Sequence, residues 1–330
     1  MLEKIKHLFQ RFGVCIKAYP GDLREFGLPV ATARFWDVLL PRGKSKRYIG
    51  TLCRRVNKEL ASLSQEYAAG KKPSPNPKMK LDKRPVWVCW WQGEEAMPPV
   101  VKLCVDQIRN CLPPDAQLHI ITWDNLKDYL ELPEYIMDKF QRGLITNIHL
   151  TDILRYGLVS NYGGAWIDAT VLLSDRIRQK LPDYLRRLYF TQRFASWEAC
   201  PQEVCRGKWC NFFFMGQAEC LLFHYVYEAL LQWWQRHDRL IDYVQVDYVI
   251  WAGYCGVEQI RQAVDQVPLG NEEIWLLWDH RNEACTRERF EEMLRANDFF
   301  KISYKGDVSK VTQDGRKTVY ARILEHNYRT

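Results

Sequence analysis

The sequence predicts an α/β fold with an N-terminal helical appendage. After about residue 81, short apolar runs typical of buried strands alternate with segments of helical periodicity. Before it, helical periodicity ends at a stretch with three alternating prolines, residues 70–77. The length of 330 residues and a composition with 47% hydrophobic and 26% charged residues are those of a folded chain with a sizeable core, which excludes disordered and fibrous classes.

The appendage is expected to span residues 1–80, with the proline-rich linker at its end. Its first helix is indicated by apolar positions near helical spacing, namely Leu2, Ile5, Phe9 and Phe12. Residues 48–69 are also expected to be helical. The first helix either lies on a membrane surface or packs on the main domain, and the sequence leaves both open.

The positive charge of the chain is concentrated in this appendage. Through Arg84 there are 19 Lys and Arg against 7 Asp and Glu, a net charge of +12, whereas the remainder carries −5. Such a segment attracts an anionic membrane, an acidic polymer or nucleic acid, or is a solvated helical face. We expect the basic residues Lys4, Lys6, Arg11 and those in residues 42–55 to hold the protein near an anionic membrane surface.

Location is predicted from what the sequence lacks. No run of about 18 apolar residues occurs, and charges interrupt the apolar positions of the N-terminus, so neither a spanning helix nor a secretory signal is expected. The 11 cysteines are irregularly spaced, which favours reduced thiols over a disulfide framework. We therefore expect a cytoplasmic protein, peripheral on the inner face of the cell membrane.

The main domain, residues 81–330, begins with the expected strand at residues 86–90. Pro98 and Pro99 then open a helix over residues 100–111, since proline is tolerated in a first turn. A second strand and two helical stretches follow at residues 118–122, 126–129 and 135–140. This alternation predicts parallel strands with crossover helices, whose ligands bind at the carboxyl ends of the strands.

Several common sites are absent from the sequence. No Gly-x-Gly-x-x-Gly follows the first strand, so no dinucleotide or other organic cofactor is expected. Gly43-Lys44-Ser45 lacks the first glycine of a phosphate loop, because position 38 is Val38. No zinc-peptidase or serine-hydrolase motif occurs. The cysteines at 200, 205, 210 and 220 lack the short spacing of zinc knuckles.

Residues 149–170 carry the strongest indication of a site. Positions 150, 153, 154, 157 and 158 form one apolar helical stripe, so His149, Asp152, Arg155 and Tyr156 share a polar face that can line a site.

Two glycines and a buried strand follow this helix. Gly163 and Gly164 suit a helix end that needs positive φ. The apolar strand at residues 165–167 then ends in Asp168. An acid there is costly to bury without a partner, which a cation would supply.

Three segments together resemble capsular polysaccharide synthesis proteins: Trp87-Val88-Cys89-Trp90-Trp91-Gln92-Gly93, Asp152-Ile153-Leu154-Arg155-Tyr156 and Tyr162-Gly163-Gly164-Ala165-Trp166-Ile167-Asp168-Ala169-Thr170. The resemblance runs over about residues 81–305 and ends with Phe299-Phe300-Lys301-Ile302-Ser303-Tyr304-Lys305. That family is related to glycosyltransferases with an Asp-x-x-Arg-Tyr helix and a strand ending in Asp-x-Asp. The resemblance implies a GT-A fold with a Rossmann-like mixed sheet and a retaining transfer of sugar from a nucleotide-sugar.

The resemblance also implies roles for individual residues. Asp168 is the expected catalytic and metal contact, and Asp247 becomes a candidate base or stabiliser if it lies near Asp168. Positions assigned to donor binding are Trp90, Trp91, Gln92, Asp152, Arg155, Gly164, Asn211 and Lys305. Of the two tryptophans, we expect only one to contact the donor. A divalent metal, Mn²⁺ or Mg²⁺, is implied at Asp168 and Thr170, where relatives carry a second acid.

The expected partners are a nucleotide-sugar donor and a glycan or lipid-linked glycan acceptor, with no nucleic acid. Two alternatives remain. The threonine at position 170 is compatible with an inactive scaffold in a polysaccharide assembly complex. The basic N-terminal region is compatible with a module that binds an anionic polymer.

Overall fold

The fold is centred on one mixed sheet. The computed structural model describes residues 2–39, 45–197, 203–270 and 272–326. Five strands follow the order β2-β1-β3-β6-β5. They are β1 (Arg84–Cys89), β2 (Ala116–Ile121), β3 (Gly164–Ile167), β5 (Tyr189–Thr191) and β6 (Phe213–Gly216). β1 runs parallel to β2 and β3, whereas β6 runs antiparallel to β3 and β5, so the predicted α/β class is confirmed.

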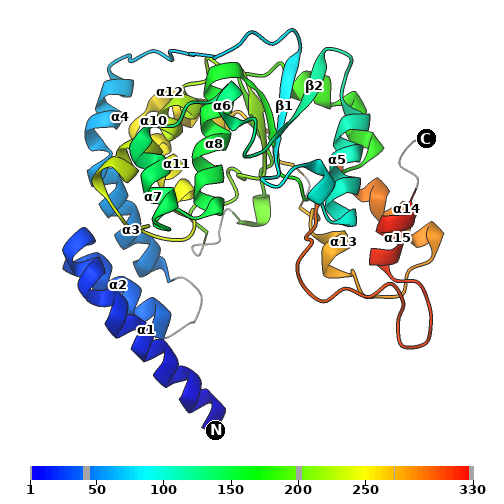
Figure 1. The fold of residues 1–330 in the computed structure, drawn as a ribbon, viewed down its shortest axis with the longest axis horizontal. Coiled ribbons are helices and arrows are strands. Elements are labelled where there is room, and N and C mark those ends of the chain that lie inside the picture. Colours follow the sequence, from blue (N-terminus) through cyan, green and yellow to red (C-terminus); the bar gives the residue numbers. More distant parts are fainter. Residues whose placement is uncertain (1, 40–44, 198–202, 271, 327–330) are drawn as a thin grey trace.

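Helices connect the parallel strands, as the alternation predicts (Figure 1). α5 (Pro99–Cys111) joins β1 to β2 and has Pro99 in its first turn, where proline costs no hydrogen bond. The connection from β2 to β3 contains α6 (Leu126–Tyr129), α7 (Glu134–Gln141) and α8 (Asn147–Tyr162). α8 ends at Gly163, whose φ of 67° is the positive value predicted for this position.

The strand order places a site at one end of the sheet. β2 and β3 lie on opposite sides of β1, so the order in which strands are added to the sheet reverses there, and the carboxyl ends of β1 and β3 form a switch point. β3 lies very close to β1, since a Cβ on Gly164 would stand 1.9 Å from the carbonyl oxygen of Pro85. Glycine at this position therefore permits the strand contact.

A small second sheet lies next to this end. β4 (Val171–Leu173) pairs antiparallel with β7 (Phe299–Lys301), and Val171 lies opposite Lys301. The turn between β3 and β4 contains Asp168 and Thr170. Residues separated by about 130 positions in the sequence are thus brought together.

The remaining helices cover the sheet and form the C-terminal part. They are α9 (Leu181–Tyr184), α10 (Leu221–Arg236), α11 (Gln245–Gly256), α12 (Glu258–Asp265), α13 (Leu276–Asp279), α14 (Arg287–Ala296) and α15 (Val319–Glu325), with short 3₁₀ turns at Glu94–Ala96, Asp175–Gln179 and Ala195–Trp197. α10 packs against both α8 and α11.

The N-terminal region divides into two parts. α1 (Leu2–Phe26) and α2 (Leu28–Leu39) form a hairpin that projects from the body (Figure 1). α3 (Lys46–Glu59) and α4 (Ala61–Ala68) instead pack on α11 and α10. Tyr48 donates to Asp242 at 2.8 Å there, and the expected helix over 48–69 is broken at Leu60. Residues 71–80 carry no helix, as the prolines predict, but α3 and α4 share the core of the main domain.

Some sequence expectations fall outside this description. The side chains of Lys4 and Lys6, and residues Arg42, Gly43, Lys44 and Cys200, lie outside the described residues. The ten cysteines within the described part are free thiols. No helix in that part is both long and apolar enough to cross a membrane.

Candidate active site

A cleft of about 530 Å³ opens at the carboxyl ends of β1 and β3. Its walls come from the end of β1, from α8, from the β3–β4 turn, from the start of α13 and from the segment that follows β7. This is the switch point of the sheet, where open α/β folds bind ligands.

Asp168 stands in this cleft, directly after β3. Its backbone N–H donates to the Phe212 carbonyl at 2.9 Å. The indole of Trp166 donates to its Oδ1 at 2.9 Å, and the ammonium of Lys301 donates to its Oδ2 at 2.8 Å. A guanidinium nitrogen of Arg155 lies 3.8 Å from Oδ1. The predicted need of this acid for a cationic partner is met by two side chains of the protein.

These contacts keep Asp168 ionised. Burial alone would raise the pKa of this carboxyl, but Lys301 and then Arg155 outweigh that cost and lower the pKa below its ordinary value. The side chain stays 26% exposed, so a ligand can reach it.

Lys301 also contacts the second position of the expected metal site. Its Nζ donates to Thr170 Oγ1 at 2.9 Å and lies 4.9 Å from the ring centre of Phe212. The ammonium therefore bridges the two oxygens that the resemblance assigns to a metal ion. Arranged in this way, Asp168 and Thr170 do not fit a divalent ion between them, because they supply a single charge and already bind a cation.

The predicted polar face of α8 is largely buried, as is nearly the whole helix. Asp152 and Arg155 are each 7% exposed, and a guanidinium nitrogen of Arg155 lies 3.3 Å from Asp152 Oδ1. Burial raises the pKa of Asp152 to about 6. Of these residues, Arg155 lines the cleft and Asp152 supports it from behind.

Asn211 connects this pair with Asp247. Arg155 donates to the carbonyl oxygen of Asn211, and Tyr156 donates to its Oδ1 at 2.8 Å. Asn211 Nδ2 in turn donates to Asp247 Oδ1 at 2.6 Å, which Trp209 also contacts at 2.9 Å.

Asp247, in the first turn of α11, is thus linked to Arg155 through Asn211. Burial raises the pKa of Asp247 to about 6 in spite of these two hydrogen bonds. Neither Asn211 nor Asp247 lines the cleft, so both act on it from the next layer of side chains.

Only two of the other predicted donor contacts line the cleft. Trp90 and Lys305 line the cleft. Trp91 is instead 8% exposed and stacks on Trp123 with ring centres 4.0 Å apart. Gln92 is exposed away from the lining residues. Gly164 belongs to the contact between β3 and β1, as described above.

Sequence reasoning missed Lys301, Trp275, Trp278, Tyr304 and Tyr243, all of which line the cleft. Lys301 had a detectable signal. It lies at the end of the apolar run Phe299-Phe300. A lysine there is costly to bury without an anionic partner, just as Asp168 is costly to bury without a cationic one. The aromatic residues gave no such signal, because the sequence has 13 tryptophans and 17 tyrosines and nothing in it separates those of a site from those of the core.

Comparison with known proteins identifies the family. The pattern that defines capsular polysaccharide synthesis proteins matches residues 43–323, which includes α3, α4 and the whole cleft. No curated protein and no solved structure matches the chain. The match covers most of the 330 residues, and the chain therefore belongs to the capsular polysaccharide synthesis protein family.

Proposed function

We propose that this protein is a glycosyltransferase of the GT-A type that moves a sugar from a nucleotide-sugar to a growing capsular or other surface glycan. The observation that carries the proposal is the ionised Asp168, held by Lys301 and Arg155 in an open cleft at the switch point of the sheet. The family membership supplies the biosynthetic context.

The charges of the cleft suit a diphosphate. Its lining contains three cationic side chains, Arg155, Lys301 and Lys305, and one acidic side chain, Asp168. When the bond from the anomeric carbon to the diphosphate oxygen breaks, the electron pair stays on that oxygen. Cations fixed nearby stabilise this developing charge. The acceptor hydroxyl oxygen forms the new bond to the anomeric carbon, and its proton passes to the departing diphosphate oxygen.

In this proposal Lys301 supplies the positive charge that a metal supplies in relatives with two acids. Thr170 replaces the second acid, and the ammonium binds both Thr170 and Asp168. Lysine is a compact point charge suited to phosphate oxygens. Transfer then proceeds without a divalent ion between Asp168 and Thr170.

The aromatic walls suit the nucleoside and the sugar. Trp90 and Tyr304 meet edge to face with ring centres 5.3 Å apart, and Trp275 and Trp278 line the same cleft. The indole N–H of Trp90 is buried and has no hydrogen-bond partner within the described part of the chain. A bound donor can supply that acceptor.

Asp152, Asn211 and Asp247 are positioning residues in this proposal. Their hydrogen bonds and ion pair fix the guanidinium of Arg155 beside Asp168. The resemblance in sequence implies the retaining outcome and the Asp-x-Asp relationship that belong to this proposal.

A scaffold without catalysis is the second candidate, favoured by Thr170 and by the cation already bound to Asp168. A panel of nucleotide-sugars separates the two functions. Release of nucleoside diphosphate supports the transferase, whereas binding of a nucleotide-sugar without release under any acceptor condition supports the scaffold.

A further inference from the structure

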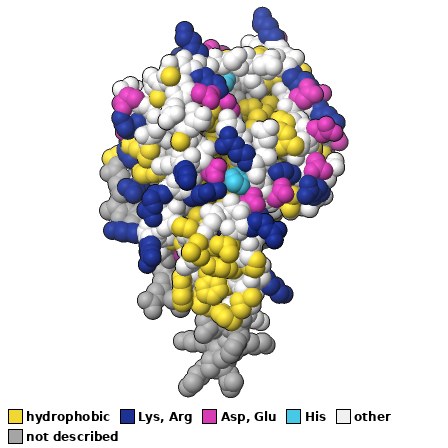
Figure 2. Space-filling model, turned by 90° about the vertical axis from the view of Figure 1, so that its left-hand side faces the viewer, with side chains coloured by type: hydrophobic (Ala, Val, Ile, Leu, Met, Phe, Trp, Pro, Cys, Tyr) yellow, Lys and Arg dark blue, Asp and Glu magenta, His cyan; other side chains and the backbone are white. Residues whose placement is uncertain are grey.

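The hairpin of α1 and α2 exposes an unusual share of the apolar surface. Of the 16 large hydrophobic side chains exposed within the described residues, seven belong to it: Phe12, Val14, Ile16, Leu23, Leu28, Trp36 and Val38. Figure 2 shows hydrophobic side chains gathered on this projection. A concentrated apolar patch marks an interaction surface.

Part of this surface is an open groove of about 460 Å³ between the two helices. Its walls are almost entirely apolar and include Ile16, Tyr19, Phe35 and Trp36. The hairpin is held to the body near its turn, where Phe26, the last residue of α1, stacks on Trp233 with ring centres 5.9 Å apart. The groove is lined by residues farther from the turn on both helices.

The exposed charges around this surface have one sign. The exposed charged side chains described between residues 10 and 60 are all basic: Arg11, Lys17, Arg24, Lys46, Arg47, Arg54 and Lys58. The acids of the same region are buried or half-buried. Asp22 is 2% exposed and pairs with Arg34 at 3.0 Å and Arg239 at 3.1 Å, and Glu25 contacts His237 at 3.0 Å.

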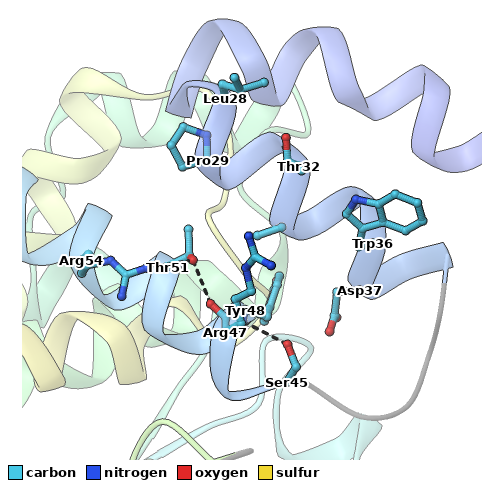
Figure 3. A pocket seen from close by; sticks show the side chains of 11 residues that line it. Leu28, Pro29, Thr32, Trp36, Asp37, Ser45, Arg47, Tyr48, Thr51 and Arg54 are labelled. Carbon is cyan, nitrogen blue, oxygen red and sulfur yellow. Dashed lines mark hydrogen bonds between the residues drawn. The ribbon is translucent and has the colours of Figure 1, made fainter.

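A second cavity, of about 600 Å³, joins the apolar surface to these charges. It lies between α2 and α3, whose side chains face one another across it in Figure 3. Arg47 and Arg54 line it together with Trp36 and one acid, Asp37. The guanidinium of Arg47 makes no hydrogen bond or ion pair with the residues described, and Arg54 donates to Thr51 at 3.1 Å.

We propose that the α1–α2 hairpin docks the protein on an anionic lipid bilayer. The apolar side chains enter the boundary between headgroups and acyl chains, and Arg47 and Arg54 bind lipid phosphates at the mouth of the cavity. An apolar face whose exposed charged neighbours are all basic is the pattern of interfacial membrane helices. The basic residues along α1 favour a helix that lies on the surface.

Co-sedimentation with vesicles tests this proposal on the full-length protein. Vesicles of phosphatidylglycerol and phosphatidylcholine are expected to bind the protein, with affinity that falls as salt is added. The double variant Val14→Glu/Ile16→Glu is expected to weaken binding more than tenfold, since two apolar side chains no longer enter the bilayer. Arg47→Gln and Arg54→Gln are each expected to weaken it about fivefold.

Val311→Glu is the matched control. Val311 is 51% exposed, similar to Ile16 at 52%, but belongs to the C-terminal segment, which Figure 1 shows at the opposite end from the hairpin. This variant should bind vesicles like the wild type, and all variants should melt like it.

Three results would overturn the proposal. The first is equal binding of the wild type and the Val14→Glu/Ile16→Glu variant. The second is displacement by inorganic phosphate beyond that by chloride of the same ionic strength, which would indicate a site for free phosphate. The third is a dimer that the double variant dissociates, without vesicle binding, because a second copy would then cover the hairpin.

Discussion

The ammonium of Lys301 lies 2.8 Å from Asp168 Oδ2, across the junction between the main sheet and the β4–β7 pair. The same nitrogen contacts Thr170, so one lysine joins Asp168 to the position where the sequence resemblance implies a second acid. A site that resembles a metal centre in sequence is thus bridged by a cation of the protein itself.

Replacing Lys301 tests its proposed role. Lys301→Ala should lower donor turnover by about 10²-fold, because the charge that stabilises the diphosphate is lost. Lys305→Ala, which removes a more exposed lysine of the same cleft, should have a smaller effect. Released nucleoside diphosphate is the readout.

The same proposal predicts the response to chelators. Wild-type turnover should persist in EDTA, and the double variant Thr170→Asp/Lys301→Ala should become dependent on Mn²⁺, since it restores two acids and removes the lysine. Loss of wild-type turnover in EDTA with recovery on adding Mn²⁺ would contradict the role given to Lys301.

The two neighbouring tryptophans should respond differently to substitution. Trp91→Ala should destabilise the fold by about 3–5 kcal/mol, because it removes a buried side chain stacked on Trp123. Trp90→Ala should destabilise less and weaken donor binding about tenfold. Thermal unfolding and calorimetric titration with the donor measure the two effects. Equal losses of donor affinity in both variants would show that the division between cleft and core is wrong.

The elevated pKa values of Asp152 and Asp247, each about 6, predict how stability depends on pH. Between about pH 4 and 6 the folded protein holds protons that the unfolded chain has released, since an unperturbed aspartate has a pKa of about 3.9. The contribution of these groups to the free energy of unfolding therefore falls as pH rises through this window. Asp247→Asn should make the fall shallower. Urea denaturation across the window measures it, and an unchanged slope in the variant would refute the assignment.

A pair of glycines tests the contact between β3 and β1. Gly164 and Gly93 have similar φ values, 84° and 86°, but only Gly164 lies against the backbone of Pro85. Gly93→Ala should cost about 1–2 kcal/mol for its backbone conformation. Gly164→Ala should cost about 3 kcal/mol or more, because β3 must also move away from β1. Chemical denaturation of both variants provides the comparison, and equal costs would mean that the contact is not constrained.

Much of the parallel part of the fold could be predicted from local signals. The apolar run of β1, the prolines before α5 and the glycine after α8 each act within a few residues of their own position. Asp168 was identified because an acid at the end of an apolar strand requires a partner.

The rest depends on long-range contacts. The partner of Asp168 is Lys301, which is 133 residues away in the sequence. Only the pairing of β4 with β7 brings the two together. The packing of α3 and α4 on the main core could not be read from their basic composition. It rests on particular contacts such as Tyr48 with Asp242.

Turnover of nucleotide-sugars by the wild type and by Asp168→Asn tests the central claim most directly. The account predicts that at least one donor in a panel releases nucleoside diphosphate with the wild type. It further predicts that Asp168→Asn, which keeps the shape of the side chain, abolishes release while the variant remains folded. Undiminished release by Asp168→Asn, or no release from any donor by the wild type, would contradict the account.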